Sequence, residues 1–332
     1  MEPPARETSP TIGELGESAV LARVLPRLRS GDASLLGPGD DAAVVAAPDG
    51  RIVVTSDMMV HGPDFRLAWS TPHDLGWKAA ATNLTDVAAM GARPTALVVS
   101  IAAPPDLPAA VLEGIADGLR DALAVLAPGA GVVGGDLSAS HALTIAVTAF
   151  GDLEGRVPVL RSGARPGDLI AHAGARGDAA RGLALLFAEA RDGAGEPDAA
   201  RAAAVRDRHP ALVAAQLAPR PPVAAGVAAA LAGATAMLDV SDGLARDARR
   251  LAEASGVGID FRGDALGADP LTALAGAEDH GLLAAFPAGT ALPHPFEVIG
   301  TTTPEAGRLT LDGTPVDTSG WDPYAGWDGV SG

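Results

Sequence analysis

The sequence predicts an α/β protein with two domains. Short runs of β-branched residues alternate with longer apolar segments of helical character along the 332 residues, an order typical of strands layered against helices. The length exceeds the roughly 100–200 residues of a single domain. A stretch rich in Gly, Pro and Arg follows residue 150 and precedes a second half of similar pattern. We therefore expect domains at residues 1–150 and 151–332.

The first half contains the best-marked helix of the chain. Thr71 can cap its N-terminus, Pro72 occupies a position whose N–H would be unpaired in any case, and Gly91 ends it. A short amphipathic helix and a strand of β-branched residues precede it. The elements predicted for this half are, in order, a helix at 18–28, a strand at 51–55, the capped helix at 72–90, a strand at 96–101, a helix at 108–126, and strands near 132–133 and 143–150.

The second half repeats this style with more alanine in its helices. Residues 191–208 are mostly Ala, Asp, Glu and Arg, which indicates an exposed segment or a short helix. The chain turns at Asp312-Gly313, a dipeptide typical of hairpins. The other predicted elements are a strand at 168–172, helices at 179–190 and 222–231, a strand at 236–240, a helix at 244–255 and a strand at 257–261.

The charge and composition exclude several classes of function. The chain has 24 Lys and Arg against 41 Asp and Glu, a formal net charge of −17, and Lys78 is its only lysine. A nucleic-acid partner is not expected, because phosphate backbones are bound by clustered Lys and Arg. A Walker A loop is excluded, because Lys78 lies in Gly-Trp-Lys-Ala rather than Gly-Lys-Ser/Thr. The hydrophobic fraction of 48% with only 3% aromatics predicts a core of small aliphatic side chains.

The absence of cysteine excludes disulfides, thiolate nucleophiles and cysteine-based metal sites. It is compatible with a reducing compartment, and we expect a cytoplasmic protein. No run approaches 18 uninterrupted apolar residues, so no membrane association is expected. Residues 1–10 contain charges and prolines where a signal peptide needs an apolar core.

The most informative feature is the position of the acidic residues. Many follow apolar strands rather than lying on polar helix faces, and strand ends in α/β folds converge on one crevice. Converging carboxylates repel one another unless cations lie between them, and hard oxygen ligands beside hydroxyls favour Mg²⁺, usually together with substrate phosphates such as those of ATP. The alternative is that each acid separately occupies a turn or caps a helix. The clusters are Asp40-Asp41, Thr55-Ser56-Asp57, Asn83 to Asp86, Asp136, Asp239 to Asp242, and more weakly Glu278-Asp279.

Asp86 is the most diagnostic of these acids. It lies on the capped helix with Thr82 and Asn83, flanked by the apolar Leu84 and Val87. A carboxylate among apolar helix positions should be paired or metal-bound if it is buried. An exposed stripe is the alternative, which the few charges nearby do not favour.

Two familiar motifs fail on their context. Residues 129–134 match Gly-x-Gly-x-x-Gly, but they follow a helix and open a strand, the reverse of a dinucleotide site. Residues 239–243 resemble a calcium loop, but the position of its bidentate glutamate is Arg250. The seven histidines are dispersed and support neither a zinc site nor a catalytic triad. Three aromatic residues near the C-terminus, Trp321, Tyr324 and Trp327, suggest a tail that docks on the core or stacks on a flat ligand.

Taken together, the motifs resemble the thiamine-monophosphate kinase family of the aminoimidazole ribonucleotide synthetase superfamily. The resemblance implies the two-domain fold of that superfamily, with N-terminal sheets paired across a homodimer. It also implies ATP-dependent phosphorylation of thiamine monophosphate to thiamine diphosphate with several Mg²⁺ ions. The motifs are Gly-Asp-Asp-Ala at 39–42, Thr-Ser-Asp at 55–57, Asn-Leu-Thr-Asp-Val-Ala-Ala-Met-Gly-Ala at 83–92, Gly-Gly-Asp at 134–136, Arg-Ser-Gly-Ala-Arg-Pro-Gly-Asp at 161–168 and Asp-Val-Ser-Asp-Gly-Leu at 239–244.

The same resemblance implies roles for individual residues. Asp57 and Asp136 would be the most critical, and no residue would act as a nucleophile. Asp64 replaces the histidine that the family usually has before the position of Phe65, and the family's Gly-Gly-Glu-Asp reads Gly-Ala-Glu-Asp at 276–279. The implied metal ligands are Asp41, Thr55, Ser56, Asp57, Asp86, Asp136, Asp239 and Asp242; the ATP contacts are Gly135, Asp136, Arg161 and Ser241; the substrate contacts are Asp64, Glu278 and Trp327.

The expected mechanism is direct in-line transfer of the γ-phosphoryl group to the substrate phosphate. It needs positioning and charge neutralisation rather than a nucleophile or a strong base, because the acceptor phosphate is already ionised. Two alternatives remain at this point. One is another ATP-dependent reaction of the superfamily, of the purine-biosynthesis type; the other is a non-enzymatic acidic protein that binds divalent ions.

Overall fold

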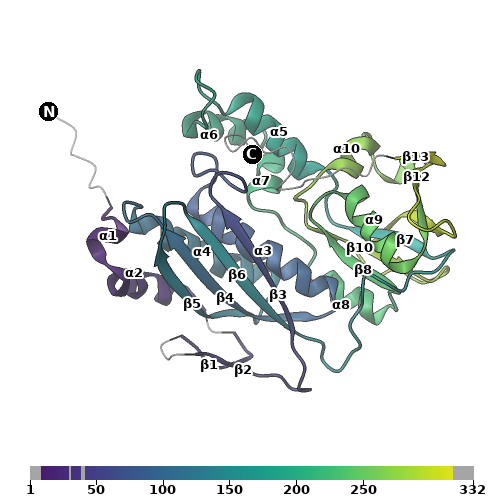
Figure 1. Ribbon diagram of the computed structural model, residues 1–332, viewed down its shortest axis with the longest axis horizontal. Helices are drawn as coiled ribbons and strands as arrows, with labels where there is room; N and C mark the ends of the chain where they lie inside the picture. The colour runs from purple at the N-terminus through teal and green to yellow at the C-terminus, as the bar shows by residue number, and fades with distance from the viewer. Residues whose placement is uncertain (1–8, 30, 39–41, 317–332) are drawn as a thin grey trace.

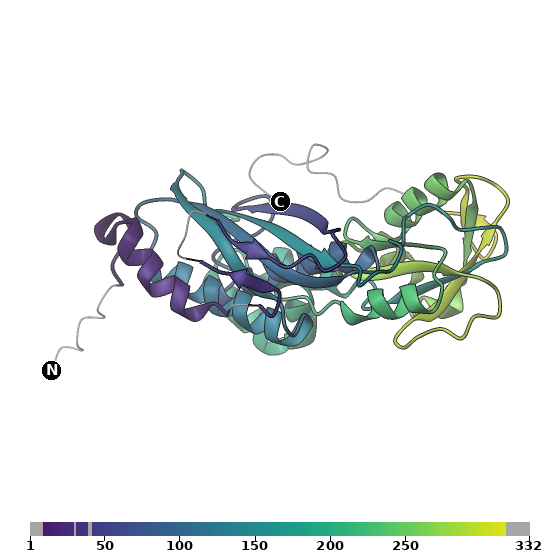
Figure 2. The same cartoon turned by 90° about the horizontal axis from the view of Figure 1, so that it is seen from below.

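The computed structural model describes residues 9–29, 31–38 and 42–316 and has the α/β architecture that the sequence predicts. Figure 1 shows two sheets side by side, with helices packed against each. Turned by a right angle, the molecule is elongated, with the N-terminal and C-terminal sheets toward opposite ends (Figure 2). No helix in this described part is long and apolar enough to cross a bilayer.

The first sheet has the strand order β3-β6-β4-β5 and is antiparallel except for the parallel pair β4 and β5. Helices α3 and α4 cover one of its faces, and α2 packs against α4 (Figure 1). The elements of this half are α1 (Ile12–Leu15), α2 (Glu17–Val24), η1 (Leu25–Arg27), β1 (Ser34–Leu36), β2 (Val44–Val45), β3 (Val53–Val60), α3 (Pro72–Ala89), β4 (Arg93–Ala103), α4 (Ala109–Leu126), β5 (Gly131–Ala139) and β6 (Thr144–Asp152).

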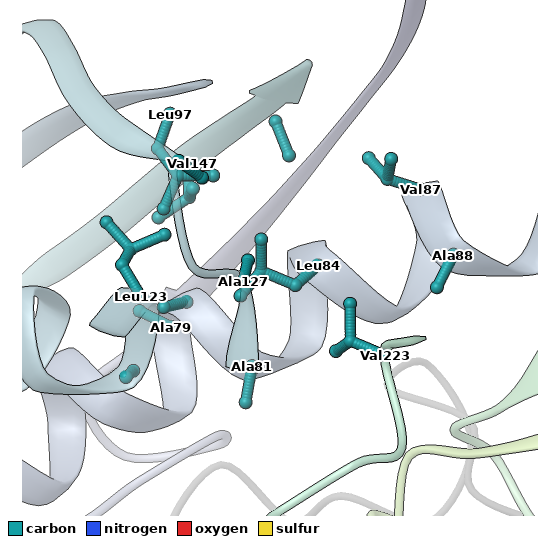
Figure 3. Close-up of a cluster of buried hydrophobic side chains, with 14 of the residues drawn as sticks. Ala79, Ala81, Leu84, Val87, Ala88, Leu97, Leu123, Ala127, Val147 and Val223 are labelled. Carbon is teal, nitrogen blue, oxygen red and sulfur yellow. The ribbon is translucent and has the colours of Figure 1, made fainter. Parts of the chain in front are cut away.

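Small residues allow α3 to be buried on nearly all sides. A Cβ at Gly76 would lie 1.9 Å from the carbonyl oxygen of Ile115, and a Cβ at Gly118 would lie 2.1 Å from that of His73, so only glycine permits α3 and α4 to approach this closely. Figure 3 shows α3 presenting Leu84 and Ala88 to a cluster that also contains Val223, from the second half of the chain. Helix α3 therefore connects the two sheets through one core.

The second sheet has the order β13-β12-β9-β11-β7-β10-β8 and is antiparallel except for β12 and β9. Helices α5, α6 and α7 pack together near the start of α3 (Figure 1). The elements are β7 (Leu169–Ala173), α5 (Asp178–Glu189), α6 (Ala199–Arg208), α7 (Pro210–Leu217), α8 (Ala224–Leu231), β8 (Ala236–Val240), α9 (Leu244–Ser255), β9 (Gly258–Phe261), η2 (Gly263–Ala265), α10 (Pro270–Ala275), β10 (Gly281–Phe286), β11 (Glu297–Thr303), β12 (Leu309–Leu311) and β13 (Thr314–Pro315).

The predicted and observed elements differ in length, and several short elements were not predicted, among them β1, β2, α7 and α10. The strand expected at 51–55 continues to Val60 as β3, so Asp57 lies inside a strand rather than after one. Strands β10 and β11 were not predicted. Every residue of β10 is buried between β7 and β8, but its sequence, Gly-Leu-Leu-Ala-Ala-Phe, has neither alternation nor β-branched residues. The domain division at residue 150 remains a prediction.

Candidate active site

The first part of the site lies where β3 meets α3. Side chains alternate between the two faces of a strand, and Thr55 and Asp57 are on the face of β3 that α3 covers. The Thr55 hydroxyl donates a hydrogen bond of 2.9 Å to the Asp86 carboxylate. One turn earlier on α3, the Asn83 side chain accepts the backbone N–H of Asp57 at 3.1 Å. Asp86 is thus held against β3 by a hydroxyl, with no basic partner at hydrogen-bond distance among the described residues.

The second part of the site comes from β8 and the loop that follows it. Burial, followed by the negative charges of Asp86 and Asp57, raises the pKa of Asp239 to about 7. Burial and the neighbouring charge of Asp57 likewise raise the pKa of Asp86 to about 6, although Thr55 and Arg161 oppose the shift. The pKa of Asp57 is raised by burial and by the charges of Glu278, Asp242 and Asp64. These aspartates repel one another, and only a partner of opposite charge would relieve the repulsion.

The loop between β8 and α9 is shaped by Asp247, a residue that the motif analysis did not select. Its carboxylate accepts the backbone N–H groups of Ser241 at 3.0 Å and of Asp242 at 2.9 Å. Arg250 contacts both Asp247, at 2.6 Å, and Asp242, at 2.7 Å. The only signal in the sequence was an acidic residue in the first turn of a helix, which is too common to be diagnostic. The Ser241 side chain lowers the pKa of Asp239 against the effect of burial.

Arg161 is the basic residue that acts on this group of aspartates. Its positive charge lowers the pKa of Asp86 against the effect of burial. Its backbone carbonyl accepts a hydrogen bond of 3.2 Å from Ser255, which ties the segment before β7 to the end of α9. The expected contact of Arg161 with ATP stays a prediction, and its charge is felt at Asp86.

The predicted substrate residues line a separate small cavity of about 100 Å³. Asp64 accepts the backbone N–H of Val60 at 2.7 Å, and Glu278 forms an ion pair of 2.5 Å with Lys78. Burial opposes ionisation of Glu278, but the Lys78 ammonium and His280 together outweigh it and hold the pKa of Glu278 below its ordinary value. Lys78 was considered in the sequence only to exclude a phosphate loop; its buried position on α3 was not anticipated.

The cavity and the group of aspartates belong to one continuous region. The backbone N–H of Glu278 donates to the carbonyl oxygen of Ser241 at 2.8 Å, which joins the loop before β10 to the loop after β8. Along α3, the eight residues from Lys78 to Asp86 correspond to about 12 Å of helix rise. The site therefore has an acidic end at Asp86 and Asp239 and an end with mixed charges at Lys78 and Glu278.

The chain does not bring all of the predicted ligands to this place. Ser56 points to the opposite face of β3, where its hydroxyl donates to the carbonyl oxygen of Val147 at 3.1 Å and accepts from Thr148. Asp136 lies on β5, at the other edge of the sheet and in one row with Met58 of β3. Three strand spacings amount to about 14 Å. Within one copy of the chain, Ser56 and Asp136 are therefore apart from Asp57 and Asp86.

Gly135 and Asp136 line a larger hollow of about 560 Å³ beside α2 and α4. Gly135 also has a structural reason to be glycine, because a Cβ there would lie 1.9 Å from the carbonyl oxygen of Val99 on the neighbouring strand. Asp136 accepts a hydrogen bond of 2.8 Å from Ser138. Asp41 and Trp327, two further predicted site residues, lie outside the described residues.

Within residues 9–29, 31–38 and 42–316, no three His, Asp or Glu side chains form a ready-made set of metal ligands. The Asp57, Asp86 and Asp239 carboxylates influence one another without meeting at one point. Mg²⁺ differs from Ca²⁺ or Zn²⁺ in usually needing only one or two protein carboxylates, with waters and substrate phosphates completing its shell. The donor set of hard oxygens with unrelieved repulsion fits Mg²⁺ in that mode.

Comparison with known proteins gives a consistent result. Residues 39–153 match the sequence model of the family described as AIR synthase related protein, N-terminal domain. The chain is 45% identical to the thiamine-monophosphate kinase of Mycobacterium tuberculosis, over 96% of this chain and 93% of that protein. It is 39% identical to that of Corynebacterium glutamicum, over 97% of each.

Solved structures agree with these sequence matches. The thiamine monophosphate kinase of Aquifex aeolicus superposes with a TM-score of 0.70 at 30% identity, over 82% of this chain and 90% of that one. The complex of AaThiL with AMPPCP and TMP superposes with a TM-score of 0.71 at 30% identity, over 93% of this chain and 97% of that one. The fold assigned above therefore also occurs in proteins of this kind.

Proposed function

This chain belongs to the thiamine-monophosphate kinase family, and we propose how its residues phosphorylate thiamine monophosphate with ATP to give thiamine diphosphate. The activity follows from relatives that match nearly the whole chain and from a solved relative in complex with AMPPCP and TMP. The observation that carries the mechanism is the group formed by Thr55, Asp57, Asp86 and Asp239, whose carboxylates repel one another within hydrogen-bonding reach of hydroxyl groups.

We propose that this group holds several Mg²⁺ ions together with the phosphates of ATP. Bound there, Mg²⁺ would neutralise the charge that develops on the transferring phosphoryl group. Thr55 orients Asp86 through its 2.9 Å hydrogen bond, and Asp247 fixes the loop from which Asp242 extends. Arg161 contributes the direct positive charge. The Ser241 hydroxyl, whose side chain acts on the pKa of Asp239, is proposed to contact a phosphate oxygen.

Transfer is in line and needs no protein nucleophile. The acceptor is a phosphate oxygen that is already ionised, so the residues position two anions rather than remove a proton. The raised pKa values of Asp86 and Asp239 reflect negative charges with too few partners. That surplus is suited to cations that arrive with the nucleotide, which explains how a chain of net charge −17 can bind a triphosphate.

We propose that thiamine monophosphate lies along α3, with its phosphate toward Asp86 and its rings toward Glu278. The thiazolium ring is cationic, and Asp64 and Glu278 supply carboxylates at that end of the site. Trp327, which lies outside the described residues, is proposed to stack on the substrate. The rise of about 12 Å between Lys78 and Asp86 suits an extended molecule with rings at one end and a phosphate at the other.

The active species is proposed to be a homodimer. The sheet face opposite α3 exposes Val54 and Met58, each 60% accessible, together with Ser56. Asp136 lies in the same row across this face. A second copy covering the face would bury these apolar side chains and bring Ser56 and Asp136 to the phosphates from the partner copy. The hollow beside Gly135 has a volume in the range of ligand pockets and is proposed to receive part of ATP.

We also propose the division into an N-terminal domain at 1–150, which binds ATP and dimerises, and a C-terminal domain at 151–332. The support is the pair of separate sheets, one in each part. A cytoplasmic location is proposed because the chain contains no cysteine.

The test is to incubate the purified protein with ATP, magnesium and thiamine monophosphate and to follow thiamine diphosphate by chromatography. Asp57→Asn should lower turnover on the order of a hundredfold or more, because it removes a charge at the centre of the site. The matched control is Asp264→Asn, an exposed aspartate on η2 that pairs only with Arg262 among the described residues, and it should retain full activity. The kinase assignment would be contradicted if no thiamine diphosphate formed while the protein converted the precursor of aminoimidazole ribonucleotide, supplied in place of thiamine monophosphate, into that product. Metal binding without turnover would contradict it as well.

A further inference from the structure

The cavity beside Glu278 contains a polar residue, Gln216, that the proposed mechanism does not use. Gln216, on α7, lines this cavity and is 5% exposed. Its side-chain oxygen, Oε1, is fully buried and finds no hydrogen-bond donor among the described residues. It is also the only glutamine in the sequence.

A buried carbonyl without a donor is costly, because it has lost its hydrogen bonds to water and gained none in return. Apolar residues such as the neighbouring Leu217 would fill the same place on α7 without that cost. An unpaired acceptor on a buried side chain that lines a cavity therefore indicates a ligand that brings a donor. The ligand must carry an N–H or O–H group at the end of the site away from Asp86.

The other walls of the cavity favour a flat ring with polar edges. Phe65 and Trp69 line it, each 5% exposed. The guanidinium of Arg66, which is also buried and lines the cavity, lies 4.8 Å from the Trp69 ring centroid and packs against that ring. The Lys78–Glu278 ion pair supplies the polar edge. The volume of about 100 Å³ is suited to a single small ring rather than to a nucleotide.

We propose that Gln216 determines the specificity of the enzyme for its substrate, by accepting a hydrogen bond from the amino group on the pyrimidine ring of thiamine monophosphate. This inference rests on the proposed function and adds a residue to it. The aminopyrimidine is the flat ring of that substrate and carries an exocyclic amino donor. In an analogue with a carbonyl oxygen in place of the amino group, that oxygen and the Gln216 oxygen would be two hydrogen-bond acceptors facing each other in a buried place.

A site built to receive an N–H group rejects an analogue that lacks it. The loss of one hydrogen bond together with an unpaired buried acceptor corresponds to about a ten- to hundredfold change in kcat/KM. The wild-type enzyme should therefore prefer thiamine monophosphate over its 4-oxo analogue, oxythiamine monophosphate, by at least this factor.

The experiment compares kcat/KM for the two substrates in three variants of the full-length protein. Gln216→Met keeps the size of the side chain and removes the acceptor, so the preference should fall to nearly one. Gln216→Glu keeps an acceptor oxygen, so the preference should equal or exceed that of the wild type. The control is Leu217→Met, which alters the same wall without a polar group and should affect both substrates equally. The KM for ATP should change little in all three.

The inference is overturned if the wild type does not discriminate between the two substrates, or if Gln216→Met retains the wild-type preference. It is also overturned if Gln216→Glu loses the preference, because the substrate would then not contact the acceptor oxygen. This second variant keeps the test valid should Gln216→Met fail to fold. Failure of the proposed function has a different signature, because the wild type would then phosphorylate neither substrate.

Discussion

Replacing Asp86 by asparagine should make the folded protein more stable while abolishing its activity. Asp86 lies among like charges, and burial together with Asp57 raises its pKa from 3.8 to about 6. A raised pKa means that the folded state holds the proton more tightly than the unfolded state. Ionised Asp86 therefore opposes folding at neutral and higher pH. Asparagine has no charge to bury, and its side-chain oxygen can still accept the Thr55 hydroxyl.

The magnitude follows from the interval between the two pKa values. Each pH unit of that interval is worth about 1.4 kcal/mol, so ionisation of Asp86 costs roughly 3 kcal/mol of unfolding free energy once the pH exceeds the folded pKa of about 6. As the pH falls toward 3.8, the carboxyl becomes protonated in both states and the cost disappears. The variant should thus exceed the wild type by about 3 kcal/mol at about pH 8 and by much less at about pH 4.5.

Urea unfolding of both proteins at these two pH values measures the difference in their unfolding free energies. Added magnesium should make this difference smaller at the higher pH, because it neutralises the negative charge of the wild-type site. A suitable control is Asp121→Asn. The hydrogen bonds of Asp121 to Arg120 and to His73 lower its pKa, and burial opposes this shift without reversing it. That substitution should therefore not stabilise the protein and should not respond to magnesium. A wild type as stable as Asp86→Asn at the higher pH would refute the charge repulsion on which the metal assignment depends.

Two further predictions concern the ends of the site and its assembly. Lys78→Met leaves Glu278 without its ion-pair partner at 2.5 Å. In steady-state kinetics the KM for thiamine monophosphate should rise about tenfold, with little change in the KM for ATP. An equal rise in both KM values would mean that the ion pair serves only the fold. Mixing the inactive variants Asp57→Asn and Asp136→Asn should restore part of the activity, because a mixed dimer keeps one site with both aspartates. If no activity is recovered after subunit exchange, the proposal that Asp136 acts from the partner copy is contradicted.

Local sequence signals predicted much of the fold, and the exceptions have physical reasons. Thr71 caps the start of α3 as predicted, and Asp74 completes a reciprocal hydrogen bond there. The helix at 244–255 and the strand at 236–240 have the predicted bounds. Strand β10 could not be recognised, because a fully buried strand of Leu and Ala has no period that distinguishes it from a helix. Its place in the sheet is fixed by its neighbours β7 and β8.

The site was predictable only as far as local motifs extend. The residues that surround Asp86 and Asp239 could be named because each lies in a short run of polar residues within an apolar stretch. Gln216 and Lys78 belong to no such run, and their significance depends on a cavity formed by segments far apart in the chain. Ser56 and Asp57 lie on opposite faces of β3 because side chains alternate along a strand. The sequence did not indicate this, because the predicted strand ended at residue 55, whereas β3 continues through both residues.

The burial of Lys78 has a practical consequence for following motion in this protein. It is the only lysine in the sequence, and its side chain is 5% exposed and paired with Glu278. An acylating reagent can therefore modify a side-chain amine only when α3 parts from the loop that carries Glu278. The rate at which the acylated peptide containing Lys78 accumulates, followed by mass spectrometry, would then report how often the thiamine end of the site opens.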